Sequence, residues 1–491
     1  MRTWLFLISA AALCAEPQDP AEKAQRAREL VVAGKAEEAI PIYRELARAF
    51  PNDARVLVNL SVAEFKAKRY RDAAEHAEAA VKLEPDSLTA NLFLGSSYVE
   101  LGQHLRAVAP LEKVVVRQPD DRNARLMLAE ALLAVERYDE AVMQFQKARE
   151  LAPGNSRVWY GLGRSFEALR DRAFQQLETT ARESPYWHAL VADACLKQRR
   201  YGSAFAHYRQ ALAGRAGLRG LHAGLAAVYR ETGHADWARA EEEREQAAPS
   251  PNCALEGRAC DFAAGRYDEI AATADAATAP EARYWTYRAY AELARRAYRH
   301  LEQAPSSIES HLHAANTLTA EGRDREAAGE WREALRLSPG DAQIQTGLTW
   351  SLYRTHDLEE ALPLLRELLD RQHESREWNF LYGASLLNLD QPEKALPFLE
   401  TAVRLDGQFL PAQAALGQTL LSMGKASQAI PHLKAAVVGD EDGSAHFQLL
   451  RAYQLTGQTE LAGRALAEYQ EARRLAEEKT RMEEAGGITQ P

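Results

Sequence analysis

The chain has 491 residues, and 60 lysines and arginines against 70 aspartates and glutamates give it a formal net charge of −10 at pH 7. Hydrophobic residues make up 46% of the chain, which is too much apolar material for a disordered protein. The acidic balance argues against non-specific nucleic-acid binding, which requires a basic face, and four cysteines are too few for a disulfide-built scaffold.

The first fifteen residues have the pattern of a secretory signal peptide. Met1 and Arg2 form a short positive start, an apolar run follows as far as Leu13, and small residues stand at Cys14 and Ala15. The run is too short to span a bilayer of about 30 Å. We predict cleavage after Ala15 and export to the periplasm or the exterior. In a second interpretation Cys14 is the lipidated first residue of a lipoprotein, although Leu13 is larger than the residue such signals usually carry there.

A period of 34 residues runs through most of the remaining chain. Prolines mark it at Pro51, Pro85, Pro119 and Pro153, and again from Pro305 to Pro339. Within a period, apolar residues recur three and four places apart, which indicates two amphipathic helices. In the unit beginning at residue 88, Gly102 separates the helices and Pro119 ends the second. Each period is therefore predicted to be a short helical hairpin that buries its apolar stripe by stacking on its neighbours.

The spacing of large and small residues within each period resembles that of the tetratricopeptide repeat family. The matching residues in the third unit are Leu94, Gly95, Tyr98, Ala107, Leu111 and Pro119, and those in the twelfth are Gly383, Leu386, Ala395, Leu399 and Ala402. The resemblance covers roughly residues 20–470. It implies an all-α fold, an α-solenoid wound as a right-handed superhelix of about fourteen hairpins. Its functional implication is a surface that binds proteins or peptides.

Departures from the period divide the chain further. We predict an N-terminal array over residues 16–247, atypical hairpins acting as a hinge over 248–305, a C-terminal array over 306–470, and a charged capping helix with a disordered tail over 471–491. Two hairpins are shortened between their helices, because the expected alanine arrives early at Ala173 and again at Ala297. An internal duplication explains both, and two independent loop losses are the alternative.

Two cysteines lie in the hinge, at Cys253 and Cys260. On one continuous helix, residues seven apart are separated by about 10.5 Å, which exceeds the span of a disulfide. A bond between them therefore requires Cys253 to lie before the helix, and the turn-forming residues Pro251 and Asn252 favour this placement. Two unpaired, partly buried thiols remain the alternative. Cys195 stands at a helix-packing position and is predicted to be a small core residue.

No pattern of catalytic or metal-binding residues stands out. His311 and His313 flank one residue on a predicted helix, so they point to different faces. The acidic segment 439–443 lacks the spacing of a calcium loop and falls on a turn between repeats. We therefore predict a non-catalytic protein with no metal and no cofactor.

The family uses the first helix of each hairpin to line a concave groove. Carried over to this chain, the resemblance places eight candidate partner-binding residues there: Val62, Phe65, Leu92, Tyr160, Trp350, Tyr353, Arg354 and Phe380. An apolar groove with aromatic and arginine anchors suits an extended peptide or an amphipathic helix. Packing between adjacent hairpins is the competing interpretation of these residues. The resulting hypothesis is an exported scaffold that binds a protein partner, with no nucleic acid and no transmembrane span. The alternative is an accessory subunit or lipoprotein of an envelope assembly or secretion complex.

Overall fold

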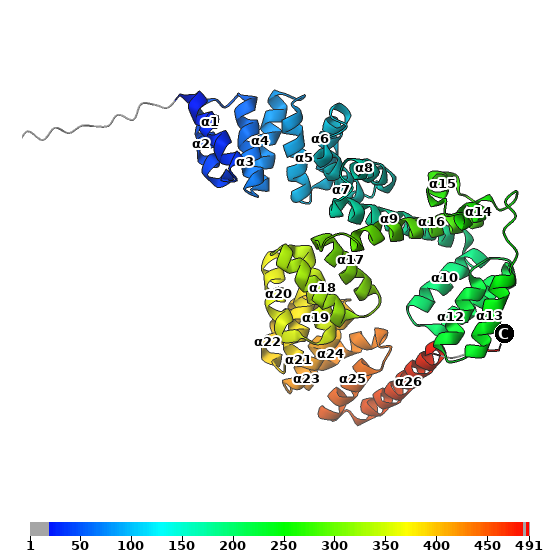
Figure 1. The fold of residues 1–491 in the computed structure, drawn as a ribbon. Coiled ribbons are helices and arrows are strands. Elements are labelled where there is room, and N and C mark those ends of the chain that lie inside the picture. The colour runs from blue at the N-terminus through cyan, green and yellow to red at the C-terminus, as the bar shows by residue number, and fades with distance from the viewer. Residues whose placement is uncertain (1–18, 485–487, 491) are drawn as a thin grey trace, which may run out of the picture. The chain divides into compact units, whose positions relative to one another are not determined.

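The computed structural model describes residues 19–484 and 488–490, so the predicted signal peptide and Cys14 lie outside the described residues. All regular secondary structure in the described part is helical, which confirms the all-α prediction (Figure 1). None of these helices combines the length and the apolar character needed to cross a bilayer.

The chain divides into two compact units, one ending at Leu169 and the other beginning at Arg170. The division falls inside α9 (Ser156–Ala181) and not in the predicted hinge over residues 248–305. The sequence placed the break at the Pro-rich segment because composition changes there. The structure places it where a repeat has lost its turn.

The first unit is a row of helical hairpins, each packed on the next. Its helices are α1 (Pro20–Val32), α2 (Ala36–Ala49), α3 (Ala54–Lys66), α4 (Tyr70–Leu83), α5 (Leu88–Glu100), α6 (His104–Arg117), α7 (Arg122–Ala134) and α8 (Tyr138–Leu151). Asp53, Ser87 and Asp121 begin α3, α5 and α7, and each side chain accepts a backbone N–H of the first turn.

The second unit begins with two hairpins and a small, irregular one. These helices are α10 (Pro185–Lys197), α11 (Tyr201–Gly214), α12 (Leu221–Glu231), α13 (Ala235–Ala247), α14 (Gly257–Ala263), α15 (Tyr267–Ala272) and the long α16 (Pro280–Glu302). A second regular array follows, formed by α17 (Ile308–Ala320), α18 (Asp324–Leu337), α19 (Ala342–Thr355), α20 (Leu358–Arg371), α21 (Arg376–Asn388), α22 (Pro392–Leu405), α23 (Leu410–Ser422), α24 (Ala426–Ala436), α25 (Ser444–Leu455) and α26 (Thr459–Glu484).

Every two-helix repeat among the described residues turns at one residue with left-handed backbone geometry. In the α5–α6 hairpin this residue is Gly102, with φ of 70°, and the next N–H, of Gln103, donates to the carbonyl of Tyr98 at 2.8 Å. The turn residues are Gly34, Lys68, Gly102, Glu136, Arg199, Gly233, Gly265, Gly322, His356, Asp390, Gly424 and Gly457. The period of 34 in the sequence is therefore the spacing of these turns.

Two repeats do not turn at all, which corrects the prediction of about fourteen hairpins. The two shortened segments form the continuous helices α9, of 26 residues, and α16, of 23 residues. In the repeat register their turn positions hold Arg170 and Arg295, and both lie within a helix. Arginine at this position does not by itself prevent a turn, because Arg199 turns the α10–α11 hairpin. Both straight segments are instead the shortened ones, in which the alanine expected after the turn arrives early, at Ala173 and Ala297. The fourteen repeats are thus twelve hairpins and two long helices.

Glycines let the hairpins approach one another closely. A Cβ atom added at Gly347 would lie 2.5 Å from the indole of Trp331, on the preceding helix. Gly161 faces Phe145 and Gly224 faces Tyr208 in the same way. Glycine is needed at these positions because the facing side chain is large and leaves no room for a Cβ atom. Each contact between helices therefore depends on a matched pair of one glycine and one large side chain.

Candidate functional site

Two helices of the C-terminal array hold the four binding residues predicted for it, and the three aromatic ones pack against the same core cluster. Trp350, Tyr353 and Arg354 lie on α19, Phe380 lies on α21, and Phe409 immediately precedes α23. We call these five residues the aromatic surface. Its helices are fixed at their N-termini, because the side chains of Asp341 and Ser375 accept N–H groups of the first turns of α19 and α21.

The rings of the aromatic surface form two edge-to-face pairs. The ring centroids of Trp350 and Tyr353 lie 6.3 Å apart, and those of Phe380 and Phe409 lie 5.2 Å apart. The guanidinium of Arg354 lies 5.7 Å from the Trp350 ring and donates to Asp324 at 3.1 Å. These contacts hold the side chains in defined positions before any partner arrives.

The chemistry of the aromatic surface suits a protein partner. Trp350, Tyr353 and Phe380 are half-buried, so each ring is packed on one side and accessible on another. Burial raises the pKa of Tyr353. The Arg354 side chain is 46% exposed. Fixed aromatic rings beside an accessible arginine are the typical composition of binding hot spots.

The four candidate residues of the first unit are not joined in the same way. Phe65 contacts Tyr70 and Phe93 with centroids 5.3 and 5.4 Å apart, so it packs between adjacent hairpins. Val62 packs against the core of the first hairpin. Leu92 is half-buried on α5, and Tyr160 lies on α9 beside Arg164. Phe380 makes a similar contact with Phe409 of the next repeat, so packing between hairpins does not by itself decide the role of Phe65 or Val62, and their binding role stays a prediction.

Three histidines of the second unit make contacts between neighbouring helices. His222 on α12 pairs with the buried carboxylate of Glu241 on α13, and His311 on α17 pairs with Glu330 on α18 at 2.7 Å. His313 instead stacks on Tyr298 with centroids 3.7 Å apart. Within the described part of the chain, no group of three or more metal-ligating side chains comes together.

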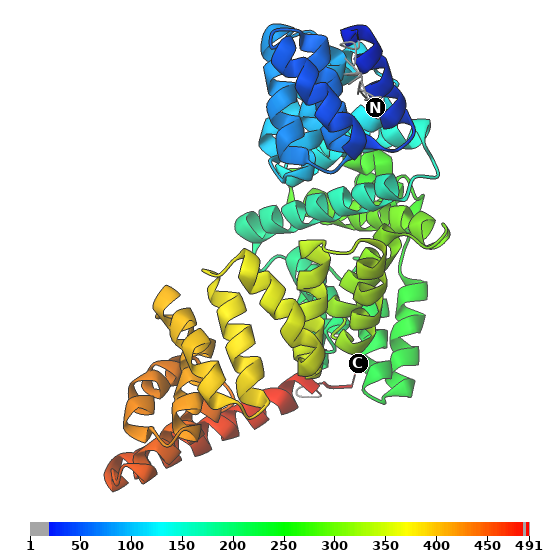
Figure 2. The same cartoon turned by 90° about the vertical axis from the view of Figure 1, so that its left-hand side faces the viewer.

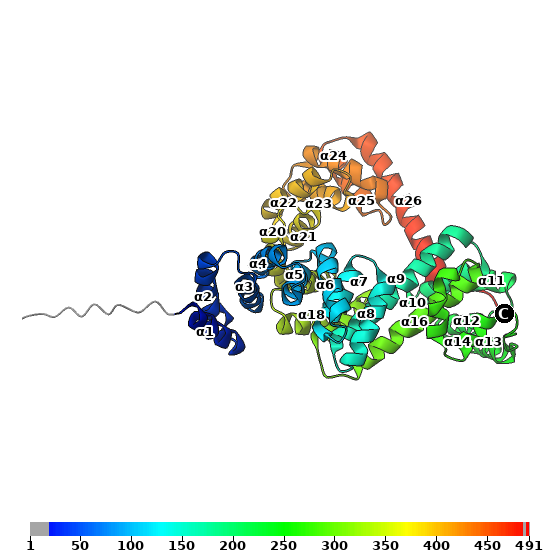
Figure 3. The same ribbon diagram turned by 90° about the horizontal axis from the view of Figure 1, so that it is seen from above.

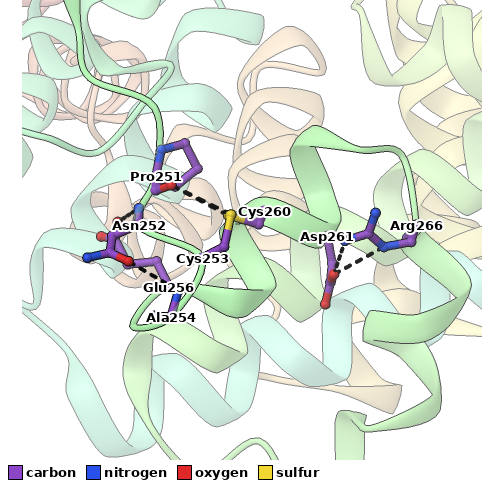
Figure 4. The surroundings of a disulfide bond; sticks show 8 residues. All are labelled: Pro251, Asn252, Cys253, Ala254, Glu256, Cys260, Asp261 and Arg266. Atoms are coloured by element: carbon purple, nitrogen blue, oxygen red, sulfur yellow. Dashed lines mark hydrogen bonds and ion pairs between the residues drawn. A yellow bond between two sulfur atoms is a disulfide. The ribbon is translucent and has the colours of Figure 1, made fainter.

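The irregular hairpin contains the predicted cysteine pair, and the structure joins the two sulfurs. Cys253 lies on the turn before α14 and Cys260 lies inside that helix, with Cα atoms 5.6 Å apart (Figure 4). The carbonyl oxygen of Pro251 lies 3.7 and 3.5 Å from the two sulfur atoms. This is the geometry that the sequence requires for a bond, with the first cysteine outside the helix.

A cavity of about 610 Å³ adjoins this hairpin. Its wall includes the 214–220 loop, Pro251, Phe262, Trp285 and Arg288. The charged groups in the wall have partners of their own. Arg215 pairs with Glu256, and Arg288 donates to the Tyr284 hydroxyl at 2.8 Å while lying 5.3 Å from the Phe262 ring. The cavity lining therefore combines apolar with charged side chains, and Arg215, Glu256 and Arg288 have partners within the protein.

Sequence reasoning missed Phe409 and the cavity. Phe409 lies in a turn between repeats, outside the positions that the resemblance assigns to the groove. The cavity forms between segments as far apart as residues 214 and 288, and no local pattern connects them.

Comparisons with known proteins agree with the repeat geometry. Models described as tetratricopeptide repeat match residues 25–87, 126–173 and 282–430, together more than half of the chain. A model of anaphase-promoting complex (cyclosome) subunit 3 matches residues 66–148, and one of the bacterial transcriptional activator domain matches residues 381–485.

Individual relatives are distant or partial. Sperm-associated antigen 1 of Rattus norvegicus is 33% identical over 105 residues, which is 21% of this chain and 12% of that protein. MamA from Desulfovibrio magneticus RS-1 is 26% identical, covers 30% of this chain and 84% of its own, and has a TM-score of 0.28. A tetratricopeptide repeat protein from Parabacteroides merdae ATCC 43184 is 13% identical, covers 68% of this chain and 98% of its own, and has a TM-score of 0.34.

Because these TM-scores are low, the assignment rests on the matched repeat models and on the recurring hairpin with its turn residue. The chain belongs to the tetratricopeptide repeat family.

Proposed function

We propose that this protein is an exported, non-catalytic scaffold that holds an extended peptide or an amphipathic helix of a partner on the aromatic surface. The observation that carries the proposal is the contact between Trp350, Tyr353 and Arg354 on α19. Phe380 on α21 packs against the same core cluster as Trp350 and Tyr353. Tetratricopeptide repeats mediate protein interactions, and this surface combines aromatic rings with an accessible arginine in one place.

Export is the second element of the proposal. The N-terminal pattern of residues 1–15 favours it, and so does the pairing of Cys253 with Cys260. Disulfides persist in oxidising compartments and are rare where thiols are kept reduced.

Crosslinking followed by mass spectrometry on envelope fractions of the native host identifies the partner and tests export together. The triple substitution Trp350→Ala, Tyr353→Ala and Phe380→Ala should weaken capture of that partner at least about thirtyfold, as expected for loss of a hot spot. Arg354→Ala should weaken it less, and it leaves the aromatic packing in place.

Leu105, Val116 and Met143 provide a matched control. These side chains are apolar and 78%, 78% and 55% exposed, and they lie outside the aromatic surface. Their triple substitution by alanine should leave capture unchanged. Equal capture by the aromatic triple variant and the wild type, with both folded by circular dichroism, would overturn the assignment of the surface.

A further inference from the structure

The last helix extends beyond the array that it ends. α26 packs on α25 as the second helix of a hairpin, and it also packs against α11, which lies more than 240 residues earlier in the chain. The end of α26 lies beside the α11–α13 region in all three views (Figures 1, 2 and 3). The second unit therefore closes on itself through its C-terminal helix.

Ion pairs along α26 favour one continuous helix. They are Arg464–Glu460, Arg473–Glu477, Arg474–Glu471, Arg474–Glu478 and, to the turn before α25, Lys479–Glu441. Pairs three and four residues apart stabilise an exposed helix. Its 26 residues span about 39 Å, which lets the helix connect α25 to α11 without support along its whole length.

Beyond the helix, the chain end reaches α12. Ile488 packs against the core of the α10–α13 hairpins, and the Tyr229 hydroxyl donates to the carbonyl of Thr489 at 2.7 Å. Tyr229 is fully buried between Phe205 and Trp237, with ring centroids 5.9 and 5.6 Å away. The prediction of a disordered tail is therefore wrong for residues 488–490.

The tyrosine at the same repeat position in α5 has a hydrogen-bond acceptor within its own array, whereas Tyr229 depends on the tail. Tyr98 occupies the equivalent position in α5, and its hydroxyl donates to Glu78, twenty residues earlier, at 3.0 Å. Twenty residues before Tyr229 the chain has Arg209, which has no acceptor atom to offer. The Tyr229 hydroxyl thus finds its acceptor in the C-terminal segment, and a buried hydroxyl without one is unfavourable.

We propose that α11 and α12 form a peptide-binding site and that the chain's own segment 488–490 is its resting occupant, acting as a latch that keeps the second unit closed. The site takes an extended segment with a branched aliphatic side chain, like Ile488, followed by an accessible main-chain carbonyl. A partner that presents this chemistry competes with the tail and releases the latch. This site lies on helices other than those of the aromatic surface, so the two proposals stand separately.

Hydrogen exchange at the C-terminal amides of the full chain tests the latch. Ile488→Asp should speed exchange there more than about tenfold, because an aliphatic contact is replaced by a charge. Tyr229→Phe should speed it about fivefold through loss of one hydrogen bond. Thr489→Ala is the matched control and should have no effect, because only the main-chain carbonyl of this residue is used.

A synthetic peptide with the sequence of residues 484–491 tests whether the site exchanges its occupant. Titrated to millimolar concentration by NMR, it should bind the Ile488→Asp chain saturably. It should bind the wild-type chain several-fold more weakly, because the tethered tail competes at an effective concentration in the millimolar range. A peptide of scrambled sequence should bind neither.

Three results would overturn the proposal. The first is wild-type tail amides that exchange as fast as those of the free peptide. The second is a peptide that binds the Ile488→Asp chain no better than the wild type. The third is tail protection that rises with protein concentration, which would show that a second copy supplies the segment.

Discussion

The α19–α20 hairpin and the long helix α16 derive from the same repeat, yet one turns and the other does not. His356 ends α19 with a φ of 62°, and the next N–H, of Asp357, donates to the carbonyl of Leu352 at 2.9 Å. At the equivalent position of α16, Arg295 is helical and pairs with Glu292 one turn earlier. The turn is thus present in the full-length repeat and absent in the shortened one, whose alanine arrives early at Ala297.

The difference shows what shapes the array. In a regular hairpin the chain reverses direction between the two helices, so successive hairpins stack side by side. In a continuous helix this reversal is missing. The continuous helix α9 contains the boundary between the two units, and α16 follows the disulfide-linked irregular hairpin. Loss of a turn and loss of regular stacking therefore coincide.

The largest effect is expected from breaking a regular joint. Gly347→Ala places a methyl group against the indole of Trp331, and such overpacking costs about 1–3 kcal/mol of the free energy of unfolding. Urea denaturation measures the loss, and adding Trp331→Leu should restore part of it. Gly329→Ala is the control, because nothing lies near its added methyl group, and it should stabilise α18 by about 0.5–1 kcal/mol. If Gly347→Ala leaves the free energy of unfolding unchanged, the pairing of a glycine with a large side chain does not determine how these helices pack.

The irregular hairpin should depend on its cross-link in a way that the regular hairpins do not. Replacing Cys253 and Cys260 by serine should destabilise this segment by about 2 kcal/mol, since the closed loop is short. Limited proteolysis near residue 255 reports the change. Reductant should reproduce it in the wild type and have no effect on the double variant. Three reactive thiols in denatured, unreduced mature protein would show that the bond is absent.

The same substitution should have opposite signs at the two equivalent positions. Compared with alanine, glycine at His356 should stabilise the protein by about 1 kcal/mol, because it removes the strain of a left-handed side-chain-bearing residue. Compared with alanine, glycine at Arg295 should destabilise it by about 1 kcal/mol, because that position is inside a helix. Thermal unfolding of the four variants measures both differences. Equal signs would contradict the role assigned to the turn position.

The smallest expected effect is on the pH dependence of stability, to which histidines in two regular hairpins should contribute with opposite signs. The hydrogen bond to Glu64 raises the pKa of His76, so its stabilising effect is present below its unfolded pKa of about 6.5 and is lost as the pH rises through the raised value. Burial lowers the pKa of His432, so this residue destabilises the fold as the pH falls below about 6.5.

Each histidine substitution should therefore change the free energy of unfolding most at acidic pH, and the two changes should have opposite signs. His76→Gln should lower stability by about 0.5–1 kcal/mol more at pH 6 than at pH 9, and His432→Gln should reduce the loss of stability on acidification. Unfolding midpoints across this pH range measure both. A His76→Gln effect that is the same at both pH values would contradict the ion pair with Glu64.

The sequence predicted the hairpins because their determinants are local. The turn at Gly102, the stop before Pro119 and the small residue at Gly95 all act within one repeat. The grouping of Trp350, Tyr353 and Phe380 followed from the same register. Phe65 could not be assigned in this way, because its partner Phe93 lies on the next hairpin and decides which side of the ring is covered.

By itself, the sequence determined the repeat, its period, the all-α fold and the one arrangement in which Cys253 can reach Cys260. Only the tertiary structure decided that a cavity forms beside the disulfide and that Tyr229 bonds the chain end at Thr489, 260 residues away. The physical reason is the separation along the chain over which each interaction acts. Helix propensity, capping and turn geometry act over a few residues, whereas these contacts depend on how a long row of hairpins accumulates its curvature and brings distant segments together.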